Sequence, residues 1–543
     1  MKILLVMPTP FEKGRLGLEN VIWLSEPVSL TAVGAAVSDR HEVRVLDLRL
    51  EAEGALLETL LEFEPDIVGT TSMTTDAYQA KAVLRTARNV CPHALTVVGG
   101  HHPTLTPEEF EEDFIDVIVQ GEGEHTFREI VERWEAQRAH GDRSFQGVAG
   151  ARYRASNGAR CVNRKREQTA NLDELPVPDR RLLDKYRGRY FFTGIRPMAS
   201  IFTSRGCSFD CNFCAIWEFY ERRTRFLSAS KIVDQMEACA EPFVFLLDDN
   251  FLTSRKRAVA LCDELERRSV KKYWMTQGRT DFAADHPELM ERLAKNGLVM
   301  VLSGFESNSD DNLAALRKRS TWQKNKAASD VLKKNGIIST GIFMVRPDFT
   351  KEQFDQLFEY VNSLSIAIPL FTILTPLPGT QLYKAYKDKL LTTDHRLFDL
   401  LHAVLPTRLP RDEFYKEFCR AYPATKASFH DAALNILRKR SDFIGKTFTG
   451  MLWFFARTFR YQKIQYDYRS FLRDEEGLLN GPGAVAGLTW QDIHYPTGEE
   501  ADPPRAQAPS TRITQLRIPK RTWVDELPTS SANTLQATAG AAQ

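Results

Sequence analysis

The chain has 543 residues, of which 43% are hydrophobic, and its 72 Lys and Arg nearly balance its 71 Asp and Glu, for a formal net charge of +1. This length exceeds one ordinary hydrophobic core, so we expect two or three domains. The near-zero charge argues against a dedicated nucleic-acid-binding protein, which needs an excess of basic residues. Three of the eight cysteines are close together, which fits a reduced compartment with a metal site better than a disulfide framework.

We expect neither a signal peptide nor a membrane span. The apolar run at residues 1–8 is short, ends in proline and lacks a small-residue cleavage site. No stretch reaches the roughly 18 uninterrupted apolar residues that a spanning helix needs. The sequence therefore predicts a cytoplasmic protein whose contact with a membrane, if it has one, is peripheral.

The first part of the chain alternates short apolar runs with segments of helical period. The expected strands are 3–6, 43–48, 67–71, 95–98 and 117–119, and the expected helices are 28–37, 52–63, 78–90, 108–114 and 124–138. Such alternation predicts a doubly wound α/β fold with a parallel sheet, which binds ligands at the carboxyl ends of its strands. Those ends carry glycines, which allow close approach of a ligand, and a Ser/Thr run that can donate hydrogen bonds.

A hairpin with an Asn157-Gly158 turn and a proline-containing connection make up residues 141–195. Residues 196–385 then predict a partial (β/α)6 TIM barrel, with strands at 199–203, 243–247, 273–276, 299–304, 338–344 and 370–374. Active sites of such barrels lie at the carboxyl ends of the strands. Residues 386–475 form a helical, basic and aromatic region, and we expect residues 476–543 to be a disordered tail because they are rich in Pro, Thr, Ala, Gln and Ser.

The most informative motif follows the first barrel strand. Cys207, Cys211 and Cys214 have C-x3-C-x2-C spacing. Iron–sulfur clusters are normally held by four thiolates, so three would leave one iron of a 4Fe-4S cluster open. The alternative is a structural zinc site, which fits worse because the nearest further cysteines, Cys239 and Cys262, lie in helix-like segments.

This spacing resembles the radical S-adenosylmethionine (SAM) superfamily. The resemblance implies that the amine and carboxylate of SAM chelate the open iron and that an electron from the cluster cleaves SAM to a 5′-deoxyadenosyl radical. Gly304-Phe-Glu-Ser307 resembles a further motif of this superfamily. The run at residues 375–383 resembles the Pro-x-Pro-Gly-Thr-x-Leu-Tyr signature of its cobalamin-carrying branch.

The resemblance implies a set of SAM-binding residues: Phe213, Asp248, Asp249, Arg279, Glu306 and Ser307. Other roles stay open for several of them. Asp249 or Asn250 could cap a helix, Ser307 could do the same, and Arg279 could belong to a structural ion pair. No conventional catalytic acid or base is expected beside the cluster and cofactors.

Beside such a barrel, the loops of the N-terminal sheet resemble the cobalamin-binding domain of class B radical SAM enzymes, which places this domain at residues 1–140. The implied cobalamin-binding residues are Thr71, Ser72, Met73, Thr74, Gly99, Gly100, His101, Gly121, Glu122 and Glu124. The Asp-x-His-x-x-Gly motif of many cobalamin proteins is missing from the sequence, so we expect no histidine beneath the cobalt. His101 and His102 could contact the cofactor or be exposed loop residues.

Residues 7–28 and 69–76 are similar to the hopanoid C-3 methylases. This implies a radical SAM C-methyltransferase that moves a methyl group through methylcobalamin to an unactivated sp3 carbon of a lipid, C-3 of the hopanoid A ring, with a flavodoxin or ferredoxin as electron donor. One alternative is a cobalamin-dependent radical SAM enzyme acting on another substrate, such as hopanoid C-2 or a non-lipid natural product. Another is a non-catalytic cobalamin sensor with a structural cluster.

One feature independent of this resemblance also favours a lipid. The segment 441–463 combines aromatic residues with basic flanks, the composition of a helix at a membrane interface. It predicts membrane contact by Trp453, Phe454 and Phe455, and the alternative is a helix packed on the barrel.

Overall fold

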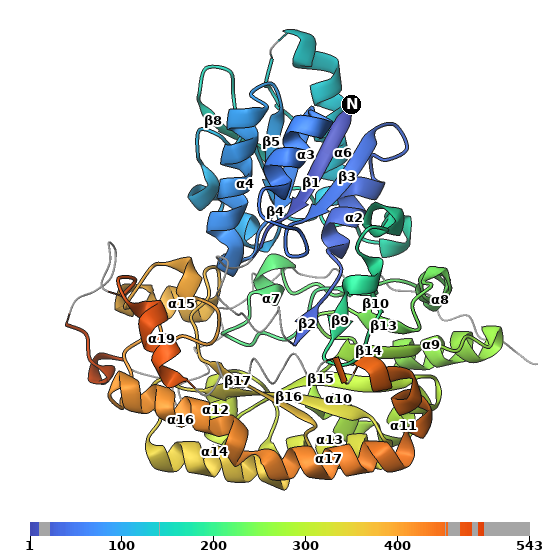
Figure 1. Cartoon of the computed structure of the whole chain (residues 1–543), viewed down its shortest axis with the longest axis vertical. Coiled ribbons are helices and arrows are strands. Elements are labelled where there is room, and N and C mark those ends of the chain that lie inside the picture. The colour runs from blue at the N-terminus through green and yellow to red at the C-terminus, as the bar shows by residue number, and fades with distance from the viewer. Residues whose placement is uncertain (10–21, 141, 451, 454–466, 480–486, 494–543) are drawn as a thin grey trace, which may run out of the picture. The chain divides into compact units, whose positions relative to one another are not determined.

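Two large sheets organise the chain, a mixed seven-stranded sheet and a parallel six-stranded sheet (Figure 1). The structure is a computed structural model and describes residues 1–9, 22–140, 142–450, 452–453, 467–479 and 487–493. No helix of these residues is long and apolar enough to cross a membrane.

The first sheet has the strand order β3-β1-β4-β5-β6-β7-β8. Its parallel strands are β1 (Lys2–Met7), β3 (Glu42–Asp47), β4 (Ile67–Thr71), β5 (Leu95–Gly99) and β6 (Val117–Val119). Along β1, Ile3 and Leu5 pack on one face of the sheet, and Leu4 and Val6 pack on the other. This alternation buries both faces and confirms the doubly wound fold.

Four helices cover these two faces. They are α2 (Val28–Ala35) and α6 (Gly123–Gln137) on one face, and α3 (Ala55–Phe63) and α4 (Ala77–Val90) on the other. The helix predicted at 108–114 is wrong. In its place, α5 (His101–Leu105) is followed by a short 3-10 helix, η2 (Pro107–Phe110), because Pro107 has no N–H to continue α5.

The predicted hairpin is formed by β7 (Ala151–Arg154) and β8 (Arg160–Val162). Gly158, with φ of +84°, provides the left-handed turn residue. Because β7 pairs antiparallel with β6, the hairpin extends the edge of the first sheet.

The second sheet contains six parallel strands in chain order, as predicted. They are β10 (Met198–Ile201), β13 (Phe243–Leu246), β14 (Tyr273–Gln277), β15 (Leu298–Glu306), β16 (Ile338–Val345) and β17 (Ile368–Ile373). The helices that alternate with them include α8 (Ala229–Ala238), α9 (Arg255–Arg268), α10 (Thr280–Asp285), α11 (Pro287–Lys295), α13 (Trp322–Lys334) and α14 (Lys351–Ser363). This is the partial barrel.

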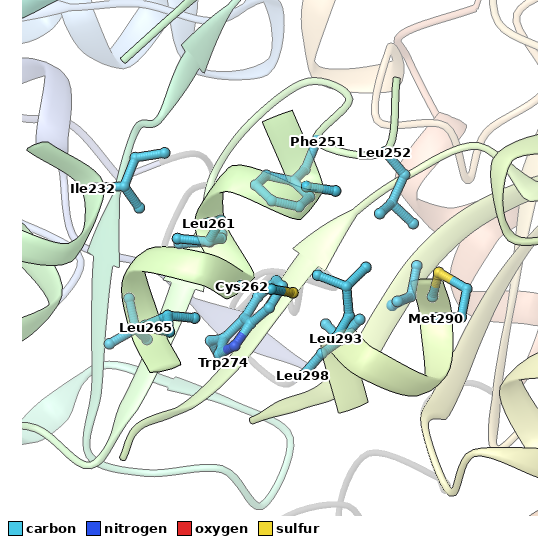
Figure 2. Close-up of a cluster of buried hydrophobic side chains, with 14 of the residues drawn as sticks. Ile232, Phe251, Leu252, Leu261, Cys262, Leu265, Trp274, Met290, Leu293 and Leu298 are labelled. Carbon is cyan, nitrogen blue, oxygen red and sulfur yellow. The ribbon is translucent and has the colours of Figure 1, made fainter. Parts of the chain in front are cut away.

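Apolar side chains fill the space between the barrel strands and helices. Figure 2 shows Trp274 of β14 among Cys262 and Leu265 of α9 and Leu293 of α11. The Trp274 indole N–H donates to the carbonyl of Asn296 at 2.8 Å, so its one polar atom is satisfied. This core holds the strands whose carboxyl ends carry the site.

The C-terminal region adds α16 (Arg411–Ala424), α17 (Lys426–Lys439), a helical segment at 441–450 and α19 (Tyr468–Glu475). Phe443 packs against Phe243 and Tyr273, which begin β13 and β14, so this region covers the amino-terminal end of the barrel. Most of the predicted tail lies outside the described residues. Within it, Ile493 is buried in a cluster with Leu390 and Leu397.

Candidate active site

The three cysteines lie in the loop between β11 (Ser204–Arg205) and α7 (Ile216–Phe219). β11 pairs with β12 (Arg225–Phe226), so the loop is closed at its base. Gly206 begins the loop with φ of +88°, and a Cβ there would lie 2.1 Å from the carbonyl oxygen of Arg223. Only glycine fits this turn. Trp217 closes the loop by donating its indole N–H to the carbonyl of Cys211 at 2.9 Å.

Burial changes the acidity of the loop thiols. It raises the pKa of the Cys214 thiol to about 12, so ligation of this cysteine would displace a proton. Burial also raises the pKa of Cys207 and Cys211.

Asp248 fixes the chain where it enters the cysteine loop. Its Oδ1 accepts hydrogen bonds from the backbone N–H groups of Thr203 at 2.6 Å and Ser204 at 2.8 Å. Its Oδ2 accepts from the Thr203 hydroxyl at 2.6 Å and from Arg257 at 2.8 Å. Both oxygens of this buried carboxylate are therefore used within the protein. Asp248 therefore positions the start of the loop, and its predicted contact with SAM stays a prediction.

Asp249 is the acid that faces a cavity. It accepts the N–H of Gly206 at 3.1 Å, and burial raises its pKa to about 7. The capping alternative for Asp249 and Asn250 is wrong, because Ser254 is the N-cap of α9. Asp249 thus remains the candidate for binding the ammonium of SAM.

The other predicted SAM residues have partners within the barrel. Glu306 Oε1 accepts from Lys318 Nζ at 2.7 Å, and Arg279 pairs with Asp281 at 2.8 Å. Arg279 also donates to the carbonyl of Lys318 at 2.5 Å. Arg279 thus forms the structural ion pair that was its alternative role. These charges hold the barrel loops beside Cys211.

Two further predicted residues take no part in these ion pairs. Ser307 accepts the N–H of Ser309, which itself caps α12 (Asp310–Ala315). Phe213 packs against a cluster that contains Leu316. The contacts of both residues with SAM stay predictions.

A cavity of about 330 Å³ lies between the carboxyl end of the first sheet and the cysteine loop. Most of the predicted cobalamin-binding residues line it: Thr71, Met73, Gly99, Gly100, His101, Gly121, Glu122 and Glu124. Asp249 and Ser204 line the same cavity from the barrel. Ser72 and Thr74 are not in its wall, since Ser72 bonds to Asp76 and Thr74 lies against His102.

Two buried polar atoms in this wall have no protein partner, namely His101 Nε2 and Ser204 Oγ. The His101 ring stacks on Phe219, with centroids 4.9 Å apart and planes at 8°. Burial lowers the pKa of His101 to about 4, so this histidine is neutral, and it is a half-buried residue at the start of α5 and not an exposed loop residue. Unsatisfied buried polar atoms call for a bound partner, and the residues present therefore fit an occupant of this cavity.

Glu122 and Glu124 bind the barrel through two arginines. Glu122 accepts from Arg205 at 2.9 Å and from Arg225 at 2.8 Å, and Glu124 also pairs with Arg205. These pairs join the first sheet to β11 and β12 at the base of the cysteine loop. The sequence interpretation missed both arginines, although Arg205 stands next to Gly206 in the motif.

The predicted membrane residues are only partly described. Trp453 packs against the Phe191 ring at 4.9 Å and beneath the Arg196 guanidinium at 4.5 Å. At this position the packed-helix alternative therefore has contacts to support it. Phe454 and Phe455 lie outside the described residues.

A domain of the B12-binding kind set against a three-cysteine loop on a parallel partial barrel defines a cobalamin-dependent radical SAM enzyme. A family model of the B12 binding domain matches residues 19–131, and one of the radical SAM superfamily matches residues 201–361. The structure also resembles that of the cobalamin-dependent S-adenosylmethionine radical enzyme OxsB, with a TM-score of 0.61 at 16% identity over 77% of this chain and 66% of that one.

Three relatives narrow the class. The hopanoid C-3 methylase of Methylococcus capsulatus is 30% identical over 77% of this chain and 79% of its own. An uncharacterized methyltransferase of Pyrococcus horikoshii is 30% identical over 75% of this chain and 88% of its own. An anaerobic magnesium-protoporphyrin IX monomethyl ester cyclase of Rubrivivax gelatinosus is 29% identical over 67% of this chain and 66% of its own. The chain belongs to the cobalamin-dependent (class B) radical SAM methylase family.

The cofactors of the protein are accordingly a 4Fe-4S cluster, SAM and cobalamin. When bound, they supply one-electron chemistry on SAM and a transferable methyl group. The chain's own residues would hold them: Cys207, Cys211 and Cys214 the cluster, Asp249 the SAM, and the glycine loops with His101 the cobalamin. The surrounding buried charges keep these residues in place.

Replacing Cys211 by alanine should remove most cluster iron and abolish SAM cleavage, because the remaining two thiolates cannot hold the cluster. The control is Cys161→Ala, since Cys161 is half-buried in β8, away from the loop. Iron content and 5′-deoxyadenosine formation by the reconstituted proteins measure both effects. Wild-type amounts of 5′-deoxyadenosine from Cys211→Ala would contradict the cluster assignment.

Arg205→Met should lower the free energy of unfolding by about 3–5 kcal/mol, because it leaves the mostly buried Glu124 without its cationic partner. Arg128→Met is the matched control. Arg128 pairs with Asp39 and Glu132 while 44% exposed, and losing such a surface pair costs about 0–1 kcal/mol. Urea unfolding compares the two variants, and equal losses would show that the Arg205 pairs do not hold the domains together.

Proposed function

We propose that this protein is a radical SAM C-methyltransferase that acts on an unactivated sp3 carbon of a polycyclic lipid, C-3 of the hopanoid A ring. The observation that carries the proposal is the 30% identity to a hopanoid C-3 methylase over 77% of the chain. Such chemistry needs no general base near the substrate, since hydrogen abstraction replaces proton removal. This agrees with a site whose charged residues are nearly all engaged with one another.

The cavity supports an apolar substrate region beside the cofactors. Leu30, Val33 and Phe127 line it from the first domain, and Phe202 and Phe219 line it from the barrel. Apolar walls with a few fixed polar groups are typical of sites for mainly apolar ligands. The two unpartnered polar atoms of the wall, His101 Nε2 and Ser204 Oγ, do not distinguish one ring system from another, so the identity of the ring system rests on the relative.

The function can be tested with the anaerobically reconstituted protein, supplied with cobalamin, a reductant such as flavodoxin, a desmethyl hopanoid and SAM deuterated at its methyl group. We expect a hopanoid that carries the labelled methyl at C-3, detected by mass spectrometry, and none from Cys211→Ala. A labelled methyl group at C-2 would show that the protein is a hopanoid methylase but that the proposed ring position, C-3, is wrong. Turnover of SAM without any labelled hopanoid would contradict it.

A second candidate is an enzyme with the same cofactors that acts on a different ring system without methyl transfer. The cyclase of Rubrivivax gelatinosus, at 29% identity, is the observation that favours it. Adding magnesium-protoporphyrin IX monomethyl ester in place of the hopanoid separates the two candidates. A cyclised, unlabelled product would support the second.

We also propose peripheral contact with a bilayer, where a polycyclic lipid substrate resides. Leu434 and Leu437 lie one turn apart on α17 and are each 54% exposed. Phe448 and Leu452, also one turn apart, are 57% and 56% exposed. Since these segments cover the amino-terminal end of the barrel, away from the cysteines, such contact would anchor the protein without presenting its site to the lipid.

Replacing both Phe448 and Leu452 by aspartate should reduce sedimentation with anionic liposomes, because it places charge on the proposed contact. Binding by the parent should weaken with salt, each nearby basic residue contributing roughly 1 kcal/mol. The control is Trp322→Asp, since Trp322 is 42% exposed at the start of α13. If the double variant sedimented like the parent, the proposed membrane contact would be wrong.

A further inference from the structure

A second cluster of metal-ligating side chains lies outside the cofactor site. His102 Nε2 is 3.3 Å from Glu109 Oε2, and His395 Nε2 is 2.5 Å from the same oxygen. The three ligand atoms lie within 4.8 Å of one another. His102 and Glu109 belong to α5 and η2 of the first domain, whereas His395 begins η8 (His395–Leu397), after the barrel.

Two hydroxyl groups hold the far side of the His102 ring. The Thr74 and Thr106 hydroxyls each lie 3.3 Å from His102 Nδ1, and the Thr106 hydroxyl also donates to the backbone carbonyl of His102 at 3.1 Å. With Nδ1 held in this way, Nε2 is directed at the Glu109 carboxylate.

The second imidazole adds a third ligand at the same point. Both histidines direct Nε2 at Oε2 of Glu109, so two nitrogens and one oxygen surround a space that one divalent ion would fill. A tetrahedral ion with bonds of about 2.0–2.1 Å holds its ligand atoms roughly 3.3–3.4 Å apart. The distance from His102 Nε2 to Glu109 Oε2 already has this value, and the distance from His395 Nε2 to the same oxygen would lengthen to it when the ion binds.

The surroundings are those of a metal site. His102 and His395 are buried, and the Glu109 side chain is 33% exposed, so the carboxylate is the ligand most open to solvent. The rings of Phe110 and Phe398 flank the two histidines, each with centroids 5.6 Å from its neighbour. The Thr74 and Thr106 hydroxyls at His102 Nδ1 orient the ligand in the way that outer-shell partners of metal-bound histidines do.

We infer that His102, Glu109 and His395 form a site for one divalent transition-metal ion, of the two-histidine, one-carboxylate kind that zinc and iron(II) accept, which clasps the first domain to the segment after the barrel. The site is separate from the cysteine loop. His101, next to His102 in α5, lines the cofactor cavity, so the clasp would also fix that wall.

Zinc serves as the probe. The full-length protein is first reconstituted with its iron–sulfur cluster, which occupies the loop cysteines, then treated with a mild chelator and equilibrated with Zn²⁺. We expect about one zinc per chain by mass spectrometry of the metal content. X-ray absorption at the zinc edge should show nitrogen and oxygen ligands at about 2.0–2.1 Å and no sulfur at about 2.3 Å.

His395→Gln and Glu109→Gln should each weaken zinc binding at least about tenfold, since loss of even an outer-shell partner has that effect. His125→Gln, which removes an exposed histidine of α6, is the matched control and should keep the zinc. Absence of zinc in the parent, sulfur in its absorption spectrum, or equal zinc in parent and His395→Gln would each overturn the inference. The spectrum of the parent decides the matter even if a variant does not fold.

Discussion

The pairing of Glu122 and Glu124 with Arg205 and Arg225 is the constraint on which the rest of the site depends. The two glutamates follow β6 in the first domain, and Arg205 stands two residues before Cys207. One set of ion pairs therefore determines how the glycine loops of one domain face the cysteine loop of the other. Because these charges are largely buried, removing one partner would leave another uncompensated and would destabilise the protein.

The cysteine loop is held on its barrel side by the same means. Asp248 with Arg257, Glu306 with Lys318, and Arg279 with Asp281 are buried pairs at the carboxyl ends of successive strands. Glu306 has φ of +58°, a conformation that is unfavourable for a residue with a side chain and persists only where its surroundings enforce it. A site whose reactive groups come from cofactors needs such rigid support, because the protein contributes position and environment.

Because the cofactors supply the reactive groups and the protein supplies their surroundings, relatives can share this architecture and still carry the names of methylases, methyltransferases and cyclases. Function belongs to the site and not to the fold, so the two shared domains do not by themselves select a substrate. In this chain the wall of the cavity between the domains is largely apolar. Apolar contacts depend on shape and leave little trace in sequence motifs.

The sequence by itself determined both sheets, the position of the cysteine loop and most of the cavity wall, because strand periodicity, cysteine spacing and glycine-rich turns are local features. It did not determine the partners of the charged residues. Asp248 and Glu122 stand at strand ends like ligand-binding residues, yet their partners Arg257 and Arg225 lie in other elements, and only the fold brings them together. Likewise, His395 contacts Glu109, which is 286 residues away in the sequence. Trp453, which the composition of segment 441–463 predicted at a membrane, packs on Phe191. Ion pairs, metal ligands and ring contacts are made between distant segments, so the tertiary structure alone decides them.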